Sequence, residues 1–567
     1  MKVQLPKDLR GTKFSQVLSI ELNGFDINRL LPALFFLVVA DGHGTVKRAK
    51  EDDTVEKYLK IFFDHQDLEG FESNEGKVLL DRLIRTTLIT TSRIGTERQG
   101  EKVAAIKSYS LLAFKTAENQ GLRKVDVFVY RALKGAMQQG DSLRARLEQV
   151  FGKGVSLTYR PQVNGHYDGK TKLDTLTRLS IMFLDGFESM PSKVNRDKDE
   201  GQSSCPALAK AFAEDILSYL LTYYDLMPTQ AFMHYLQGLL SFELFIYTVK
   251  IVHAINELVL NPDQLPNAMQ ESYQSAPPQI YLDFTGEVDG ESVYMAKACV
   301  RRDIEAYRQF FTSNLLLKQM SFYVNRLKDY SRWQSQITKV LRGNDSGPLY
   351  LQGLLKLQRH PGISLQIEAM AMNHEDEIRK FNRSTKENGE EEEELPWLDA
   401  IADTGDTGVE RVVALLGEAQ KGEAVAGYLK WFWNVGGSDS LFRILDGHRS
   451  PRASWKYAPT NELLSALVQL VATRIGPTEE QNENDKGIYT IRLQDFLNCL
   501  ETRFGILIDR PPAQFEGAEY VAAARENLRA MLRRLRQMGI FRDLSDDFTT
   551  QRLHPPYAGE YLELVEG

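Results

Sequence analysis

The chain has 567 residues, of which 26% are charged and 43% hydrophobic, and its formal net charge is −8 at pH 7. These values are typical of a globular protein of several domains, and they exclude a chain that coats nucleic acid over its whole surface. The three cysteines are isolated in the sequence, so we expect neither a disulfide framework nor a cysteine-based zinc site.

Two apolar segments bear on the location of the protein. Residues 30–40 form the first apolar run, which lies too far along the chain for a secretory signal and is shorter than the roughly 20 residues that span a bilayer. Residues 236–260 are longer, but Glu243, Lys250 and His253 interrupt them. We therefore predict a helix buried in protein, no membrane contact and a cytoplasmic location.

Helical periodicity dominates the first part of the chain. Apolar residues recur at three- and four-residue spacing in six segments, which predicts helices there, and only three short segments predict strands. The expected helices are residues 26–39, 55–63, 77–91, 103–113, 125–137 and 142–151, and the expected strands are residues 16–22, 156–159 and 279–284.

Longer helices are expected in the centre of the chain, at residues 206–224, 228–260 and 292–327. The second of them is apolar on most sides, which predicts the spine of a helical domain. Polar stretches separate these blocks and predict loops or linkers; they are residues 190–204, 261–278, 385–394 and 476–487. We predict a mainly α, multi-domain protein with an N-terminal helical domain (1–188), a central helical domain (205–384), a helical connector (396–459) and a C-terminal domain (460–567).

The C-terminal domain contains a helix with an arginine stripe. Apolar residues recur at helical spacing along residues 528–538 and predict one face that docks on a core. At about 100° per residue, four arginines fall on one adjacent arc, where they can meet an anionic partner. These arginines are Arg525, Arg529, Arg533 and Arg536.

The elements around this helix follow a known order. Gly539 and Ile540 predict a left-handed cap, and residues 541–544 and 548–553 predict two short strands joined by a turn. Upstream, the pattern predicts a helix at 461–473, a strand at 488–491 and a helix at 493–504 that ends at Gly505. In this order the segment resembles a winged helix-turn-helix domain, with residues 520–538 as the recognition helix.

The resemblance implies contact with double-stranded DNA, through a recognition helix in the major groove. Here the arginines lie in the middle and C-terminal half of the helix, which favours phosphate contact over base reading, and Glu516, Glu519 and Glu526 near its start would repel DNA. We therefore predict a local nucleic-acid-binding patch. There are two alternatives. The arginines could contact a protein partner, or they could have a structural role, either solvated or paired with aspartates of the following turn. The predicted patch consists of Arg525, Arg529, Arg533, Arg536 and Arg552.

Sequence motifs of catalysis are absent, including GxxxxGK[ST], GxGxxG, GxSxG and HExxH. We predict no catalytic residue, metal or cofactor. Three loops place a histidine beside glycine, at 41–44, 164–169 and 446–449, but Asp-Gly and Asn-Gly are favoured turn pairs and a turn is the commoner explanation. The aromatic residues of 428–433 could stack on bases, although such spacing is more typical of a core plug.

Two classes of function are compatible with these patterns. The first is a non-catalytic scaffold of a multi-subunit DNA-acting system, and the second is a metal-dependent nuclease with a site in the first 350 residues. The tail LRQMGIFRDLSDDFTTQRLHPPY is similar to tails of components of bacterial anti-phage defence systems of the methylation-associated kind. This resemblance implies protein partners in a defence complex. Because no motif identifies a reaction, we expect the scaffold.

Overall fold

The architecture was analysed in a computed structural model. It describes residues 3–42, 55–63, 71–93, 101–118, 121–159, 163–187, 203–271, 278–384, 395–437, 441–448, 450, 452–474, 490–542 and 551–557. In this part of the chain, helices predominate and strands form only short two-stranded pairings, which confirms the prediction of a mainly α protein.

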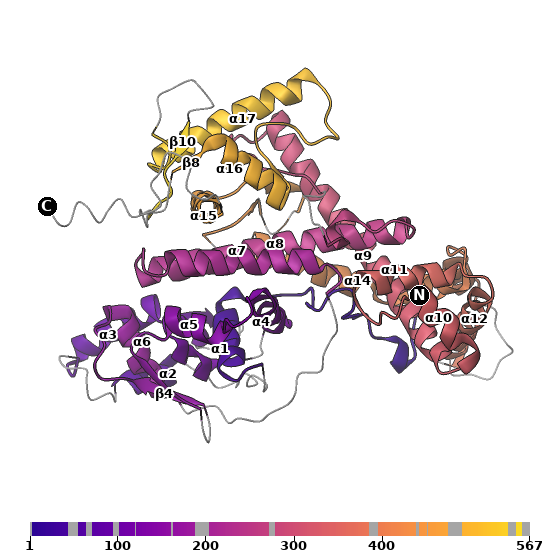
Figure 1. Ribbon diagram of the computed structural model, residues 1–567, viewed down its shortest axis with the longest axis horizontal. Coiled ribbons are helices and arrows are strands. Elements are labelled where there is room, and N and C mark those ends of the chain that lie inside the picture. Colours follow the sequence, from indigo (N-terminus) through magenta and orange to yellow (C-terminus); the bar gives the residue numbers. More distant parts are fainter. Residues whose placement is uncertain are drawn as a thin grey trace.

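The N-terminal section is a group of short helices on one side of the molecule (Figure 1). Most of the predicted segments are helical here, because their apolar faces close over one core. The elements are 3-10 helices η2 (Ile27–Arg29) and η3 (Leu111–Thr116), helices α1 (Leu30–Val39), α2 (Val55–Phe63), α3 (Asn74–Thr87), α4 (Val125–Ala136), α5 (Leu143–Phe151) and α6 (Thr175–Asp185), and strands β1 (Ile89–Arg93), β2 (Glu101–Ile106), β3 (Val155–Thr158) and β4 (Asn164–Tyr167). The 3-10 helix η1 (Lys7–Leu9) precedes them on the N-terminal segment.

Two predictions in this section are wrong. The helix expected at 103–113 is instead strand β2 followed by η3, because Val103 and Ala105 alternate toward the core and β2 pairs with β1. The strand expected at 16–22 is a series of turns. There Val17, Ile20 and Leu22 are buried at a spacing that fits neither a strand nor a helix.

Three long helices form the spine: α7 (Pro206–Tyr223), α8 (Thr229–Leu260) and α9 (Glu291–Lys328). The sequence predicts all three as helices and predicts α8 as the spine. By length and composition α8 alone, among the described helices, could cross a membrane, but 94% of its most apolar window is buried inside the protein. Such burial is that of a core helix, so the prediction of a helix buried in protein is confirmed. Strand β5 (Ile280–Tyr281) connects to α9, and the 3-10 helix η4 (Asn267–Met269) occupies part of the expected loop 261–278.

A helical lobe extends from the end of α9 (Figure 1). The N-terminal segment reaches it, since Asn382 exchanges two hydrogen bonds with the backbone of Gln4, at 2.9 and 2.8 Å. The lobe contains α10 (Ser331–Val340), α11 (Gly347–Gln358), α12 (Ile363–Ser384), α13 (Pro396–Ala402) and the first turns of α14 (Gly408–Gly436).

The aromatic cluster at 428–433 is a core plug, as its spacing predicts. Trp431 and Phe432 are fully buried on α14. The indole N–H of Trp431 and the hydroxyl of Tyr307 both donate to Oγ1 of Thr248, each at 3.1 Å. This shared acceptor joins α14 and α9 to α8, and it leaves Trp431 unable to stack on a base.

A buried carboxylate joins α9 to the C-terminal half. Asp303 accepts hydrogen bonds from His253 at 2.8 Å, from Arg302 at 2.8 Å and from the hydroxyl of Tyr457 at 2.6 Å. Burial alone would raise the pKa of Asp303, but the charge of Arg302 and the hydrogen bond from His253 outweigh it and lower the pKa to about 2. Tyr457 lies in strand β7 (Lys456–Tyr457), which pairs with β6 (Leu445–Asp446).

The lowered pKa predicts a loss of stability in acid. Because the folded pKa lies below the unfolded one, Asp303 should contribute about 2 kcal/mol above roughly pH 4, and this contribution should disappear as the pH falls toward 2. We expect the difference in unfolding free energy between the protein and Asp303→Asn, measured in urea, to shrink over this range. A difference that stays constant with pH would contradict the assignment.

The C-terminal elements lie across the spine from the N-terminal section (Figure 1). Parallel pairing of β9 with β5 attaches them to the central part of the chain. They are α15 (Asn461–Ala472), β8 (Ile491–Arg492), α16 (Leu493–Cys499), the π-helical turn η6 (Leu500–Phe504), β9 (Ile506–Leu507), α17 (Ala518–Gln537) and β10 (Arg552–Leu553), and a 3-10 turn η5 (Arg452–Ser454) precedes β7.

Candidate nucleic-acid interface

Helix α17 carries the predicted arginine stripe and ends as the sequence predicts. Gly539 adopts φ +73°, a left-handed conformation that favours glycine. The N–H of Ile540 donates to the carbonyl of Leu535 at 2.9 Å, and the N–H of Gly539 donates to that of Arg536 at 3.0 Å. Together these two bonds form a Schellman motif, and Ile540 is buried with Leu535.

One face of α17 is held on the protein body. Ala524, Ala530, Met531 and Leu535 are buried on this face, and α17 packs against α9. A fully buried amide lies among them. Asn527 accepts from the backbone N–H of Phe284 at 2.6 Å and donates to the carbonyls of Leu282 at 2.7 Å and Ile508 at 3.1 Å, so one side chain fixes the helix to two neighbouring segments.

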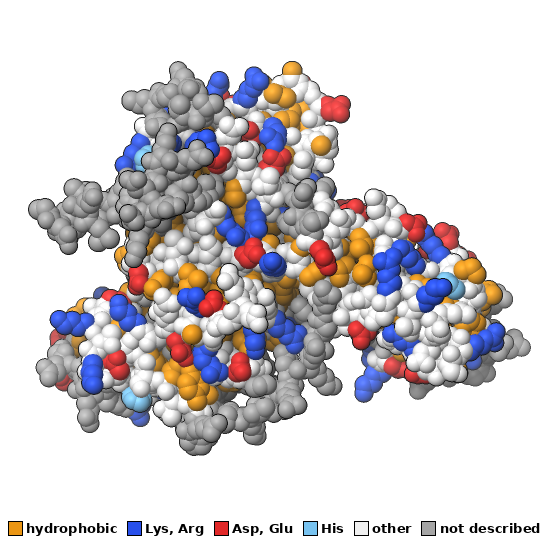
Figure 2. Space-filling view, viewed as in Figure 1, with side chains coloured by type: hydrophobic (Ala, Val, Ile, Leu, Met, Phe, Trp, Pro, Cys, Tyr) orange, Lys and Arg blue, Asp and Glu red, His pale blue; other side chains and the backbone are white. Residues whose placement is uncertain are grey.

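The opposite face exposes the predicted arginines. Arg525, Arg529, Arg533 and Arg536 are all exposed. Figure 2 shows Lys and Arg side chains spaced over the part of the molecule where α17 lies. The structure therefore brings these four guanidinium groups together on one solvent-facing surface, which we call the arginine face.

One carboxylate lies within the arginine face. Glu526 pairs with Arg529 and with Arg533, each at 3.2 Å, and hydrogen bonds from these two arginines lower its pKa. All three side chains are at least half exposed, so the pairs contribute little to stability and are screened by salt. Because Arg529 and Arg533 share this one carboxylate, the face remains positive. The aspartates proposed as alternative partners lie at 543–547, outside the described residues.

The arginine face continues toward a small strand pair. Arg536 lies over the ring of Phe541, 5.2 Å from its centroid, and Phe541 forms a bridge with Leu553 of β10. The last predicted residue, Arg552, donates to Oγ1 of Thr490 at 3.4 Å and stands opposite Arg492 in the antiparallel pair β8–β10. Directly opposed like charges are unfavourable in a sheet unless an anion or a carboxylate is near.

Arg492 and Arg534 were not predicted from the sequence. Arg492 pairs with Asp495 at 2.8 Å on the exposed edge of β8. Arg534 is half-buried on the inner side of α17, donates to the carbonyl of Pro459 at 3.3 Å and lies over the ring of Phe284. The sequence held a signal for this inward position. On the helical wheel, Arg534 lies outside the arc that the four predicted arginines occupy.

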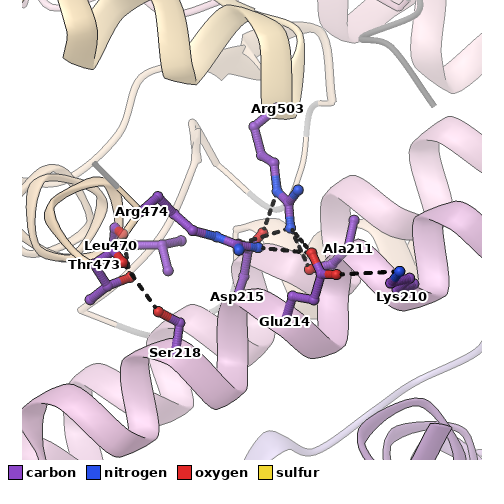
Figure 3. A network of polar contacts seen from close by, with 9 residues as sticks. All are labelled: Lys210, Ala211, Glu214, Asp215, Ser218, Leu470, Thr473, Arg474 and Arg503. Carbon is purple, nitrogen blue, oxygen red and sulfur yellow. Dashed lines mark hydrogen bonds and ion pairs between the residues drawn. The ribbon is translucent and has the colours of Figure 1, made fainter. Parts of the chain in front are cut away.

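A buried ionic cluster fixes the C-terminal elements to α7 (Figure 3). Arg503 from η6 and Arg474 from the end of α15 converge on Asp215, at 2.9 and 2.5 Å, and Glu214 pairs with both arginines at longer distances. Only 2% of the Asp215 side chain is exposed. We call this group, with the buried Glu243 behind it, the Asp215 cluster.

The interior of the Asp215 cluster contains further titratable groups. Burial raises the pKa of Glu243 well above its ordinary value, and the charge of Asp215 raises it further. Burial also lowers the pKa of Lys250 to about 7, and its ammonium group donates to the carbonyl of Arg503 at 2.8 Å. A protonated Glu243 fits beside Asp215, because two buried carboxylates cannot both carry charge at low cost.

The sequence also singles out three loops, at 41–44, 164–169 and 446–449. Residues 164–167 are strand β4 rather than a turn, and Asp168 beyond them binds the backbone N–H groups of Lys170 and Thr171. At 446–448, Gly447 adopts φ +130° and His448 is exposed, which fits the turn explanation. His43 lies outside the described residues. Among the described residues, no group of three or more His, Cys, Asp or Glu side chains could hold a metal ion.

Comparison with known proteins identifies the family. A family model described as "Methylation-associated defense system protein MAD7" matches residues 7–557, which is nearly the whole chain. Comparisons with curated proteins and with solved structures find no match. The match supports the resemblance of the C-terminal tail to methylation-associated defence proteins, and it extends this relationship across the helical body. The chain therefore belongs to the MAD7 family and is a component of a methylation-associated defence system.

Proposed function

We propose that this protein is a non-catalytic, cytoplasmic scaffold of its defence system, which binds double-stranded DNA through the arginine face and protein partners through other surfaces. The observation that carries the proposal is the exposure of Arg525, Arg529, Arg533 and Arg536 on one side of a helix whose other side is anchored. Arginine forms bidentate hydrogen bonds with phosphate, and in a chain of net charge −8 this patch offers a local site for a polyanion.

The order and pairing of the C-terminal elements support a winged-helix arrangement. Strand β8 follows α15, and it pairs with β10, the strand beyond α17. Phe541, directly after the helix cap, pairs with Leu553 on β10. Such a ribbon beside a recognition helix is the feature expected of a wing. One departure is that β9, between α16 and α17, pairs with β5 of the central section, so the proposed domain is built into the protein body.

Phosphate contact fits the arginine face better than base reading. Glu519 is exposed in the first turn of α17, and Glu526 lies between the first two arginines. If the N-terminus of α17 entered the major groove, carboxylates at these positions would be repelled by the hydrogen-bond acceptors on the base edges. The middle and C-terminal half of α17 and the strand pair beyond it supply the cations, which points to binding along the DNA backbone without strong sequence preference.

Neutralising the arginine face should weaken DNA binding and reduce its salt dependence. For Arg525→Ala/Arg529→Ala/Arg533→Ala we expect the slope of log K against log salt to fall by about 0.9 for each phosphate that is no longer neutralised, or roughly 2–3 in all. Titration of a fluorescent DNA duplex at several salt concentrations measures this slope. The fold should be retained, because these side chains are exposed and the ion pairs of Arg529 and Arg533 with Glu526 contribute little.

A matched control separates this surface from net charge. Lys60→Ala/Lys77→Ala/Arg82→Ala removes three exposed cations from α2 and α3, which lie across the spine from α17. We expect this variant to bind DNA as the unaltered protein does. Equal weakening of both variants would show that only overall charge matters. DNA binding that survives the arginine substitutions would remove DNA as the ligand of the arginine face and leave a protein partner.

A further inference from the structure

A second basic site lies in the helical lobe, far along the chain from α17. A cavity of about 620 Å³ opens between α10 and α11. Lys339 comes from the last turn of α10 and Arg342 from the turn that follows it. Gln352, Lys356 and His360 lie four residues apart, so α11 and its end present them on one face.

Close packing of the two helices shapes this cavity. Gly353 of α11 faces Leu341, and a Cβ at this glycine would come within 2.7 Å of the leucine side chain. The absence of a side chain at Gly353 allows α11 to approach the end of α10, which brings Lys339 and Arg342 to the same opening as Lys356. Val340 and Leu349 add an apolar wall.

The ionisable residues that line the cavity are all basic. They are lysine, arginine and histidine, with no aspartate or glutamate. Residues 330–362 contain five Lys and Arg but only one acidic residue, Asp345, within a chain of net charge −8. Lys339, Arg342 and Lys356 form no ion pair with any residue that the structure describes. Figure 2 shows Lys and Arg side chains gathered with a histidine on this lobe.

Gln352 adds an uncharged polar group to the cavity. The residue is 7% exposed and lines the cavity, and its amide makes no hydrogen bond with the described residues. The amide group is therefore available to a polar ligand or to water in the cavity. At the rim, Nδ1 of His360 donates to the carbonyl of Pro361 at 2.8 Å, which leaves Nε2 available on the other side of the ring.

We propose that this cavity binds a phosphate-bearing ligand of nucleotide size. Arg342, Lys339 and Lys356 would hold phosphate oxygens, and the amide N–H of Gln352 would donate to one of them. The volume lies in the range of small-molecule sites, of about 300–1,000 Å³, and the apolar wall fits the uncharged part of such a ligand. A free nucleotide and a nucleic-acid end share this chemistry, and a concave site of this size favours the free nucleotide.

Calorimetric titration of the full chain with inorganic pyrophosphate, ATP and a DNA duplex tests the proposal. We expect pyrophosphate and ATP to bind, and Arg342→Ala/Lys356→Ala to weaken both by about tenfold or more, because each substitution removes a charge-assisted hydrogen bond. Gln352→Leu keeps the size and charge of the lining but removes the amide, and it should weaken binding by a smaller factor. Thermal melts confirm that the variants are folded.

Lys380→Ala/Arg383→Ala is the matched control, since it removes one exposed lysine and one exposed arginine from α12 of the same lobe. It should bind pyrophosphate and ATP normally. The proposal is overturned if neither ligand binds at millimolar concentration, or if this control loses affinity as much as the cavity variant. It is also overturned if the cavity substitutions weaken duplex binding while nucleotide binding is unaffected, because the site would then follow a nucleic-acid backbone.

Discussion

Asp215→Ala should lower the free energy of unfolding by about 3–5 kcal/mol, since it removes the buried carboxylate that two largely buried guanidinium groups share. Arg503 and Arg474 each direct two nitrogens toward Asp215, and their side chains are only 24% and 28% exposed. Removal of Asp215 should release η6 and the end of α15 from α7. Equilibrium urea denaturation measures the loss, and proteolysis should begin in the C-terminal elements.

Glu214→Ala provides the matched control for this prediction. Glu214 lies one residue away on α7 and pairs with the same two arginines, but at 3.3 and 3.4 Å and with 35% of its side chain exposed. An ion pair of this exposure contributes about 1 kcal/mol or less. A similar loss in both variants would mean that the cluster acts through its total charge, and a loss below about 1 kcal/mol in Asp215→Ala would mean that it is not a fixed attachment.

The Asp215 cluster also shows where sequence reading fails. Asp215 and Arg503 are 288 positions apart, and neither stands out within its own helix. The spacing of apolar residues in a helix predicts which face is buried. It does not predict which distant segment supplies the partner of a buried charge. Asp303 and Tyr457, 154 positions apart, illustrate the same limit. Tertiary packing determines which residues form buried polar pairs of this kind, so they cannot be predicted from one sequence alone.

Local signals were sufficient for α7, α8, α9 and α17 and for the arginine face, but they did not give the bounds of the long helices α12 and α14. The apolar run of α8 and the one-sided apolar period of α17 both extend over many turns, and Gly539 supplies a stop signal that the Schellman bonds match. Short segments were more difficult. In β2 a few apolar residues fit both the strand and the helical period, and only the pairing with β1 decides between them.

The nucleotide-sized cavity had a signal that was visible in the sequence. Gln352, Lys356 and His360 repeat at intervals of four on a helix whose other positions are mainly apolar, which places them together on one side. The sequence could not show that α10 ends against this side, because that depends on the close approach at Gly353. The chemistry of the site was therefore readable, but its concave shape was not.

Asn527→Ala should destabilise the protein by about 3 kcal/mol and weaken DNA binding with it. The substitution removes three hydrogen bonds and leaves the N–H of Phe284 and the carbonyls of Leu282 and Ile508 buried without a partner. Each unsatisfied group costs on the order of 1 kcal/mol or more. Because Asn527 lies on the face of α17 opposite the arginines, any effect on DNA must act through the position of the helix.

Asn498→Ala is the control for this prediction, since Asn498 is exposed on α16 and its side chain makes no hydrogen bond with the described residues. It should change neither urea stability nor DNA affinity. If α17 must be held rigidly to present its arginines, Asn527→Ala should raise the Kd for duplex DNA even without denaturant, at a temperature where the protein remains folded. Reduced stability with unchanged DNA affinity would show that the arginine face binds without a fixed orientation, which would weaken the case for a winged-helix mode of docking.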